Sequence, residues 1–86
     1  MDKVDDVLAA RARTHGQFEH HASAAQAMKQ ILRGSPSWER MSDEQREAAE
    51  MIVHKLGRIA AGDPFFADHW IDISGYAQLV VRDVAQ

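Results

Sequence analysis

The sequence lacks cysteine altogether and carries little positive charge. Without cysteine, its 86 residues can form no disulfide bond and no thiolate zinc site, and nothing indicates an oxidising compartment. Ten Lys and Arg residues stand against thirteen Asp and Glu residues, which gives a net charge of −3 with neutral histidine. This balance argues against a protein that coats nucleic-acid phosphates, so nucleic acid is not an expected partner.

Long apolar runs are missing as well. Charged residues interrupt every apolar stretch well before the roughly 18 residues that a membrane span needs, so no membrane partner is expected. The opening residues MDKVDDVLAA are acidic and have no apolar core of the kind found in secretion signals. We therefore expect a cytoplasmic location.

The sequence does contain 45% hydrophobic residues, which suits one small domain spanning residues 1–86. A chain of this length buries only about 60% of the surface that its unfolded form exposes. Such a small core leaves little surplus stability, so self-association is plausible from the composition. Histidine is also frequent, with five residues in 86, although composition does not say whether they form a site.

Four segments show the apolar spacing of helices, and turn signals separate them. We expect helices over about 2–14, 18–33, 42–61 and 69–84. The pattern predicts an all-α fold, a compact domain of four helices. The breaks between the segments are His15-Gly16, Gly34-Ser35-Pro36 and Gly62-Asp63-Pro64.

Two helix starts carry capping signals. Ser42 and Gln45 have the spacing of a capping box at the start of the third segment, and Asp68 is the expected N-cap of the fourth. Trp38 and Met41, in the link before the third segment, predict a turn that is pinned to the core.

The fourth segment is apolar nearly all round, which indicates burial on more than one side. In a chain of this length, the second covering surface is most simply another subunit, so we expect a homodimer or larger homo-oligomer. The apolar positions are Trp70, Ile71, Ile73, Gly75, Ala77, Leu79, Val80, Val81 and Val84.

Acidic residues on the fourth segment suggest a site. Asp68, Asp72 and Tyr76 share one helical face, and Asp72 stands among apolar residues, where a carboxylate needs a partner. That partner could be a cation on another helix, a cluster of backbone amides or a divalent metal ion. In the simpler alternative, Asp68 only caps its helix and Asp72 only pairs with Lys55 or Arg58.

The third segment offers complementary groups. Glu47, Glu50 and His54 lie on one face, and two carboxylates spaced three apart can hold Mg²⁺, although any solvated helix face matches this spacing. Lys55 and Arg58, on an adjacent face, could contact phosphate oxygens. Antiparallel packing of the last two helices would create a four-carboxylate metal site from Glu47, Glu50, Asp68 and Asp72.

The junction between the first two segments is a second candidate. Arg11 and His15 precede Gly16, which could let a ligand approach the backbone, and the amides that begin the next helix favour an anion. The alternative is a helical corner anchored by Phe18. The adjacent pair His20-His21 is expected to be exposed, which leaves His54 and His69 as the main histidine candidates for chemistry.

Three motifs carry a resemblance that covers nearly the whole chain. The chain resembles a family of small domains of unknown function encoded by phages and prophages. The resemblance rests on Arg11 with HGQF at 15–18, on EAAEMIVHKLGR at 47–58 and on DHWIDISGYAQL at 68–79. The pattern of that family is HG(D/Q)F, KxxR and DxWxDxxGYxxL. The resemblance implies the cytoplasm of a bacterial host cell.

The pattern is also distantly similar to MazG-type all-α nucleoside triphosphate pyrophosphatases. Those enzymes bind magnesium through ExxE on one helix and ExxD on the next, and they assemble as dimers or tetramers. Glu47 and Glu50 match the first motif, whereas Asp68 or His69 followed by Asp72 replaces the second. The resemblance implies Mg²⁺ as a possible cofactor.

Three functions remain open. In the first, a small phage-type helical protein binds a nucleotide or a host protein through a charged pocket between the third and fourth helices. The second is Mg²⁺-dependent pyrophosphate hydrolysis, and the third is a structural interaction module held together by ion pairs. The expected ligand contacts are Arg11, His15, His54, Lys55, Arg58 and Tyr76.

Overall fold

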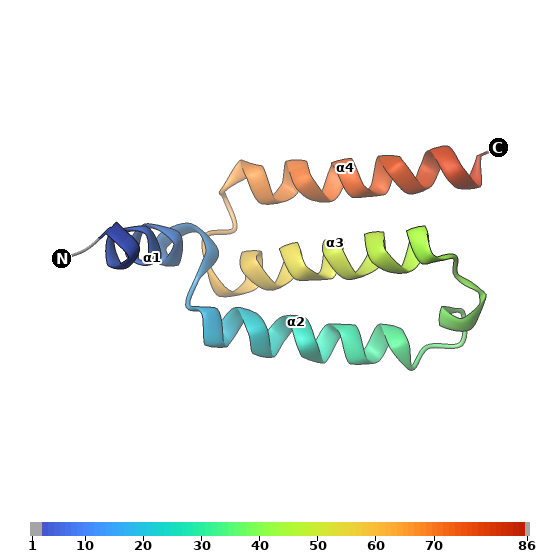
Figure 1. Ribbon diagram of the computed structural model, residues 1–86, viewed down its shortest axis with the longest axis horizontal. Helices are drawn as coiled ribbons and strands as arrows, with labels where there is room; N and C mark the ends of the chain where they lie inside the picture. Colours follow the sequence, from blue (N-terminus) through green and yellow to red (C-terminus); the bar gives the residue numbers. More distant parts are fainter. Residues whose placement is uncertain (1–2, 86) are drawn as a thin grey trace.

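The computed structural model describes residues 3–85, and all of their regular structure is helical (Figure 1). The prediction of an all-α fold with four main helices is confirmed. None of the helices within the described residues combines the length and the apolar character that crossing a membrane requires. The elements are α1 (Lys3–His15), α2 (Phe18–Arg33), the short 3-10 helix η1 (Trp38–Arg40), α3 (Asp43–Ala61) and α4 (Ala67–Val84).

The start of α3 follows the sequence signal. The Gln45 backbone N–H donates to Ser42 Oγ at 3.1 Å, and the Ser42 N–H donates to the Gln45 side chain at 2.8 Å. Each residue thus satisfies a backbone donor that the helix leaves free. The predicted capping box is confirmed.

The predicted start of α4 is wrong. Phe66 is the N-cap, and Asp68 lies inside the first turn with an exposed side chain. The reason is the preceding turn, where the Asp63 carboxylate accepts the Phe65 N–H at 2.9 Å and the Asp63 carbonyl accepts the Phe66 N–H at 3.2 Å. This turn brings the chain into helical geometry before Asp68 is reached.

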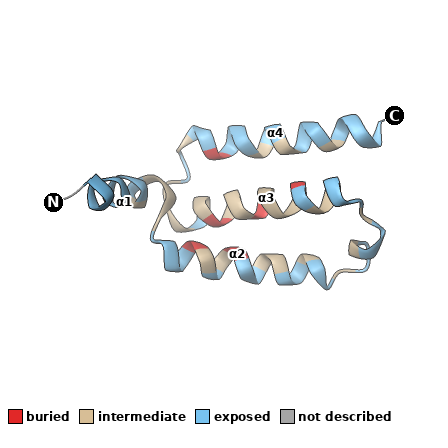
Figure 2. Ribbon diagram, viewed as in Figure 1, coloured by how far each residue is buried: buried red, intermediate tan, exposed pale blue. Residues whose placement is uncertain are grey.

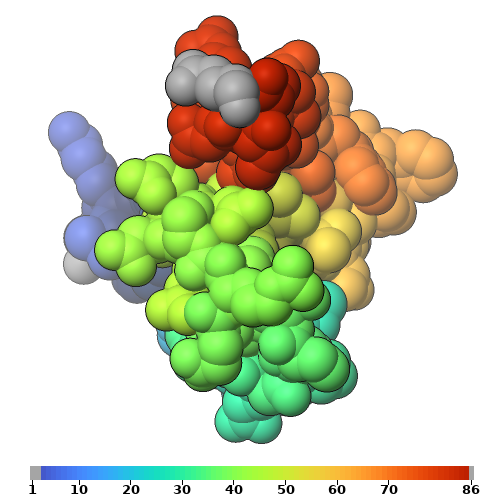
Figure 3. Space-filling view, turned by 90° about the vertical axis from the view of Figure 1, so that its right-hand side faces the viewer, coloured from blue at the N-terminus to red at the C-terminus, as the bar shows by residue number. Residues whose placement is uncertain are grey.

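The helices form an open layer. α3 lies between α2 and α4, while α1 sits at one end of the layer (Figure 1) and projects to one side of it (Figure 3). The radius of gyration is 14.8 Å, compared with about 12 Å for a compact domain of this length. Much of the helix surface therefore stays uncovered in a single chain.

The buried core is small (Figure 2). Among the described residues, the buried apolar side chains are only Ala25, Ala48 and Val53, and two histidines, His21 and His69, are buried with them. The chain exposes 6219 Å², whereas a compact monomer of its mass would expose about 5,100 Å². Eleven large apolar residues are among those that stay exposed.

The two helix corners touch each other. Gly16, between α1 and α2, has a φ of +81°, the left-handed conformation that glycine adopts most easily. A Cβ atom on Gly16 would lie 2.3 Å from the Ala61 carbonyl oxygen, and one on Gly62 would lie 2.6 Å from the Gly16 nitrogen. The absence of side chains here lets the α1–α2 corner dock on the end of α3.

Candidate functional site: a basic cavity between α1, α2 and α3

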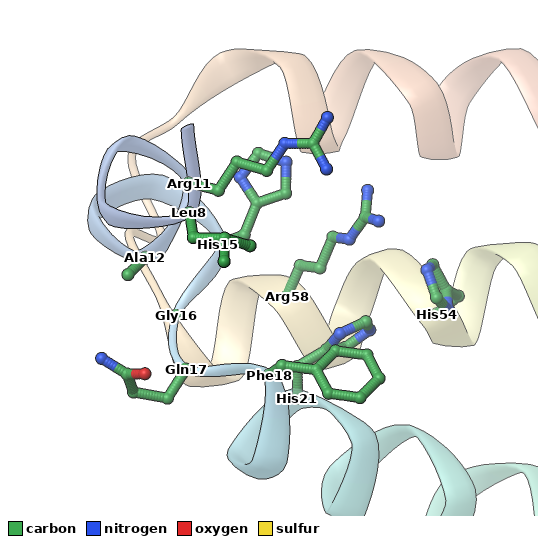
Figure 4. Close-up of a pocket in the computed structure, with 10 residues that line it drawn as sticks. All are labelled: Leu8, Arg11, Ala12, His15, Gly16, Gln17, Phe18, His21, His54 and Arg58. Carbon is green, nitrogen blue, oxygen red and sulfur yellow. The ribbon is translucent and has the colours of Figure 1, made fainter. Parts of the chain in front are cut away.

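A cavity of about 550 Å³ lies where the α1–α2 corner faces α3 (Figure 4). Two arginines and three histidines contribute to its wall, which contains no acidic side chain. The wall is therefore suited to an anion. The lining residues are Leu8, Arg11, Ala12, His15, Gly16, Gln17, Phe18, His21, His54 and Arg58.

Helical spacing explains how three elements share this wall. On α1, Arg11 and His15 are four residues apart and lie on one face; His54 and Arg58 have the same relationship on α3. The Arg11 and Arg58 side chains extend from different helices with their guanidinium groups turned toward the α4 side in Figure 4. The corner thus brings two permanent positive charges to a single cavity.

His21 is the most unusual residue of the cavity. Its side chain is only 5% exposed, and its Nε2 is buried without a hydrogen-bond partner among the described residues. The His21 and His54 rings meet edge to face with centroids 4.5 Å apart. A buried polar atom without a partner is costly, so this nitrogen is a candidate ligand contact.

The prediction that His20 and His21 are both exposed is wrong for His21. The reason is Gly57 on α3, where a Cβ atom would lie 2.9 Å from His21 Cδ2. The missing side chain lets α2 approach α3 closely, and the imidazole ring fills the space. His20, one position further round the helix, is exposed as expected.

A second histidine pair holds α1 against α4. The His15 and His69 rings are 4.6 Å apart, and Phe66 contacts both of them. His69 Nε2 lies 3.2 Å from the Thr14 carbonyl oxygen. Because a carbonyl oxygen can only accept, this nitrogen carries the hydrogen and donates it. His69, expected to be available for chemistry, is instead engaged in this helix contact.

The cavity histidines are neutral near pH 7. Burial, reinforced by the nearby Arg58 guanidinium, lowers the pKa of His54 to about 4. The same two causes lower the pKa of His15 and of His21. The positive charge of the cavity therefore comes from Arg11 and Arg58, while each neutral imidazole ring offers one donor and one acceptor.

The four carboxylates expected to hold a metal ion are not brought together. Glu50 accepts a hydrogen bond from Arg33 on α2, whereas Asp72 on α4 lies 2.9 Å from Lys55 Nζ. Since α3 lies between α2 and α4, Glu50 and Asp72 are used on different sides of it. Within residues 3–85, no three His, Asp or Glu side chains are placed to hold a metal ion. The expected cluster was Glu47, Glu50, Asp68 and Asp72.

The expected ligand contacts divide into two groups. Arg11, His15, His54 and Arg58 line the cavity; Lys55 and Tyr76 do not. The Lys55 side chain is engaged by Asp72 at the boundary between α3 and α4, where the charged pocket was expected. Tyr76 lies instead along a shallow groove on α4, with Ile71, Asp72, Gly75 and Leu79.

Sequence reasoning did not predict Phe18 and His21 as residues of the cavity wall. Phe18 was considered the apolar anchor of the corner, yet its side chain is 78% exposed. His21 was grouped with its neighbour His20. The available signal was their spacing, because residues three apart at the start of a helix face the same side, next to Gly16.

Comparison of the chain with protein-family models, curated proteins and solved structures gives no match. The resemblances to the phage-encoded domains and to MazG-type enzymes therefore remain predictions from the sequence motifs.

Proposed function

We propose that the protein binds a nucleotide, with the phosphate groups held in the cavity between α1, α2 and α3. One observation carries the proposal: Arg11 and Arg58, from two helices, share a cavity whose wall has no acidic side chain. Guanidinium groups bind phosphate through paired hydrogen bonds and stay charged at all physiological pH values. An anionic ligand would balance the positive charges of these two arginines, since the cavity wall has no acidic residue to do so.

The uncharged groups of the wall favour the same ligand. The His21 ring forms a hydrogen bond to the His54 backbone, so in the neutral ring Nε2 is the acceptor and would gain a partner from a hydroxyl or amino group of the ligand. The N-terminus of α2, at the same corner, has no side-chain cap, and the positive end of a helix dipole favours an anion. The cavity volume of about 550 Å³ is also within the usual range for small-molecule sites.

We also propose that the chain acts as a homodimer or larger homo-oligomer. A single chain exposes about 1,100 Å² more than a compact monomer would, and a standard interface buries about 800 Å² per partner. The α4 helix supplies apolar surface for such a contact, and a host protein is the alternative occupant. The exposed apolar residues of α4 are Trp70, Ile71, Leu79, Val81 and Val84.

Mg²⁺-dependent hydrolysis is the alternative function, and an assay for pyrophosphate would detect it. In a single chain, Glu50 and Asp72 are engaged by Arg33 and Lys55, so a magnesium site would have to draw its ligands from two subunits. The cytoplasm of a bacterial host cell, which the phage-like motifs imply, is the setting we propose.

Titration calorimetry with nucleoside mono- and triphosphates, and with the parent nucleosides, tests the proposal. We expect the nucleotides to bind and the nucleosides to bind at least tenfold more weakly. Arg11→Gln and Arg58→Gln should each weaken nucleotide binding roughly tenfold or more. Arg82→Gln, on the exposed end of α4, is the matched control and should leave the affinity unchanged.

Two results would count against the proposal: no binding of any nucleotide, or an equal loss in Arg82→Gln. The titrated samples should also be assayed for pyrophosphate with and without Mg²⁺. Release that disappears in Glu50→Gln and Asp72→Asn would indicate the hydrolase, whereas binding without release would indicate a binding protein.

A further inference from the structure

Phe18 is an exposed aromatic residue on the wall of a charged cavity. It is the first residue of α2, its side chain is 78% exposed, and it lines the cavity beside the arginines (Figure 4). Its ring meets the His21 ring edge to face, with centroids 6.1 Å apart. Exposure alone does not mark a site, because Phe65 is more exposed than Phe18. The distinguishing feature of Phe18 is its place on the cavity wall that also contains two arginines.

The wall of the cavity combines two kinds of surface. Leu8 and Phe18, from α1 and α2, contribute exposed apolar side chains, while Arg11 and Arg58 contribute positive charge. An inorganic phosphate would engage the charge and leave the apolar groups uncovered. A ligand that joins an anion to a flat apolar group would match both surfaces.

We propose that Phe18 is the residue that contacts the base: its ring stacks on the nucleobase while Arg11 and Arg58 hold the phosphates. This inference rests on the proposed nucleotide binding and extends it to the part of the ligand that is recognised. Aromatic rings accept any nucleobase through stacking, since every base has a flat π-face. The edge-to-face contact with His21 orients the Phe18 ring and leaves a ring face available for stacking.

A second subunit is the alternative partner that would cover the Phe18 side chain. The position of the residue favours the ligand, because Phe18 belongs to the wall that contains both arginines. The exposed apolar residues of α4, which we propose for the subunit contact, are not part of that wall. Oligomeric state must therefore be measured alongside affinity.

The test compares ATP with inorganic tripolyphosphate, which carries a similar chain of phosphates and no base. In calorimetry, Phe18→Ala should weaken ATP binding about 5- to 150-fold, the range found when aromatic rings that stack on bases are removed. Tripolyphosphate binding should change less than about twofold in this variant, a threshold that corresponds to under about 0.4 kcal/mol. Phe18→Tyr keeps a stacking ring and should retain ATP affinity.

Phe65→Ala provides a matched control. Phe65 is also an exposed phenylalanine, 91% accessible, and lies outside the cavity wall. Its replacement should leave both affinities unchanged. Light scattering should show that all these variants keep the oligomeric state of the wild-type protein.

Three results would overturn the role of Phe18. Equal losses of ATP and tripolyphosphate affinity in Phe18→Ala would show that the residue does not act on the base. Unchanged ATP affinity in Phe18→Ala would show that the ring does not stack on the base. Dissociation of the oligomer in this variant would assign Phe18 to a subunit contact. If the wild-type protein binds neither ligand, the proposed function itself fails and this inference with it.

Discussion

The Thr14 carbonyl oxygen accepts a hydrogen bond from the buried His69 ring at a distance of 3.2 Å, which joins the end of α1 to α4. The same oxygen accepts the Asp63 backbone N–H at 3.1 Å. Two segments more than 45 residues away in sequence thus meet at one atom of the first helix corner. This contact places Arg11 and His15 next to α3 and so forms one side of the cavity.

His69→Ala should destabilise the protein by about 2–3 kcal/mol, because it removes a buried ring and its hydrogen bond to Thr14. Urea denaturation would measure the loss. His20→Ala is the matched control, since His20 is exposed and should change stability by less than about 0.5 kcal/mol. Similar stabilities for the two variants would show that the corner contact contributes little.

Acid should destabilise the fold between about pH 6.5 and pH 4. The pKa of His54 falls from 6.5 to about 4 on folding, and the pKa values of His15 and His21 are lowered too. The unfolded chain therefore binds more protons in this window. The stability provided by the neutral rings is fully present above about pH 6.5 and is lost as the pH falls through the folded pKa.

Thermal melts at pH 7.5, 6, 5 and 4.5 would measure this loss. His54→Gln cannot be protonated in this range, so its melting temperature should fall less than that of the wild-type protein. The melting temperature of His20→Gln should fall as much as that of the wild type. A wild-type melting temperature that stays constant down to pH 4.5 would contradict the prediction.

Asp72→Asn should lower the melting temperature by several degrees. The Lys55 side chain is only 12% exposed and lies 2.9 Å from the Asp72 carboxylate, so the substitution leaves a largely buried cation without its counter-charge. The hydrogen bond from Lys55 also lowers the pKa of Asp72 from its ordinary value of 3.8, so the carboxylate is charged at neutral pH.

Glu47→Gln is the control for this pair, because Glu47 is an exposed carboxylate on the same helix as Lys55. Its melting temperature should match that of the wild-type protein. If Asp72→Asn melted normally but lost a stabilisation by Mg²⁺ that the wild-type protein shows, Asp72 would be a metal ligand and the ion-pair explanation would fail.

The wild-type protein should have a solution mass of at least twice the 9.6 kDa of one chain. Leu79→Glu, which places a charge on the exposed apolar surface of α4, should shift the protein toward the monomer. Gln78→Glu adds the same charge at an exposed polar position and should have a weaker effect. Multi-angle light scattering over a range of concentrations would measure all three masses, and a monomeric wild-type protein would contradict the oligomer proposal.

Local signals in the sequence predict the helices well. The second and third helices end where Gly34 and Gly62 interrupt the pattern, and the Ser42 capping box marks the start of α3. The start of α4 is less accurate, because the turn made by Asp63 precedes Asp68 and begins the helix earlier. These features depend on residues within one turn of each other, so they can be recognised without knowing the fold.

The site is predicted only in part. Arg11, His15, His54 and Arg58 carry signals as polar residues at helical spacing, and the structure places them in one cavity. The burial of His21 depends on a glycine 36 positions away, which helical spacing within α2 cannot reveal.

The sequence by itself determined where the helices lie and which residues share a face of each helix, because backbone hydrogen bonds, caps and helical periodicity act over three or four residues. Only the tertiary structure decided which faces meet. It placed α3 between α2 and α4, so that Glu50 pairs with Arg33 and Asp72 with Lys55 in place of a shared metal cluster. Helix order in space depends on close packing between distant segments, such as the contact of Gly16 with the end of α3, and spacing along a single helix does not encode it.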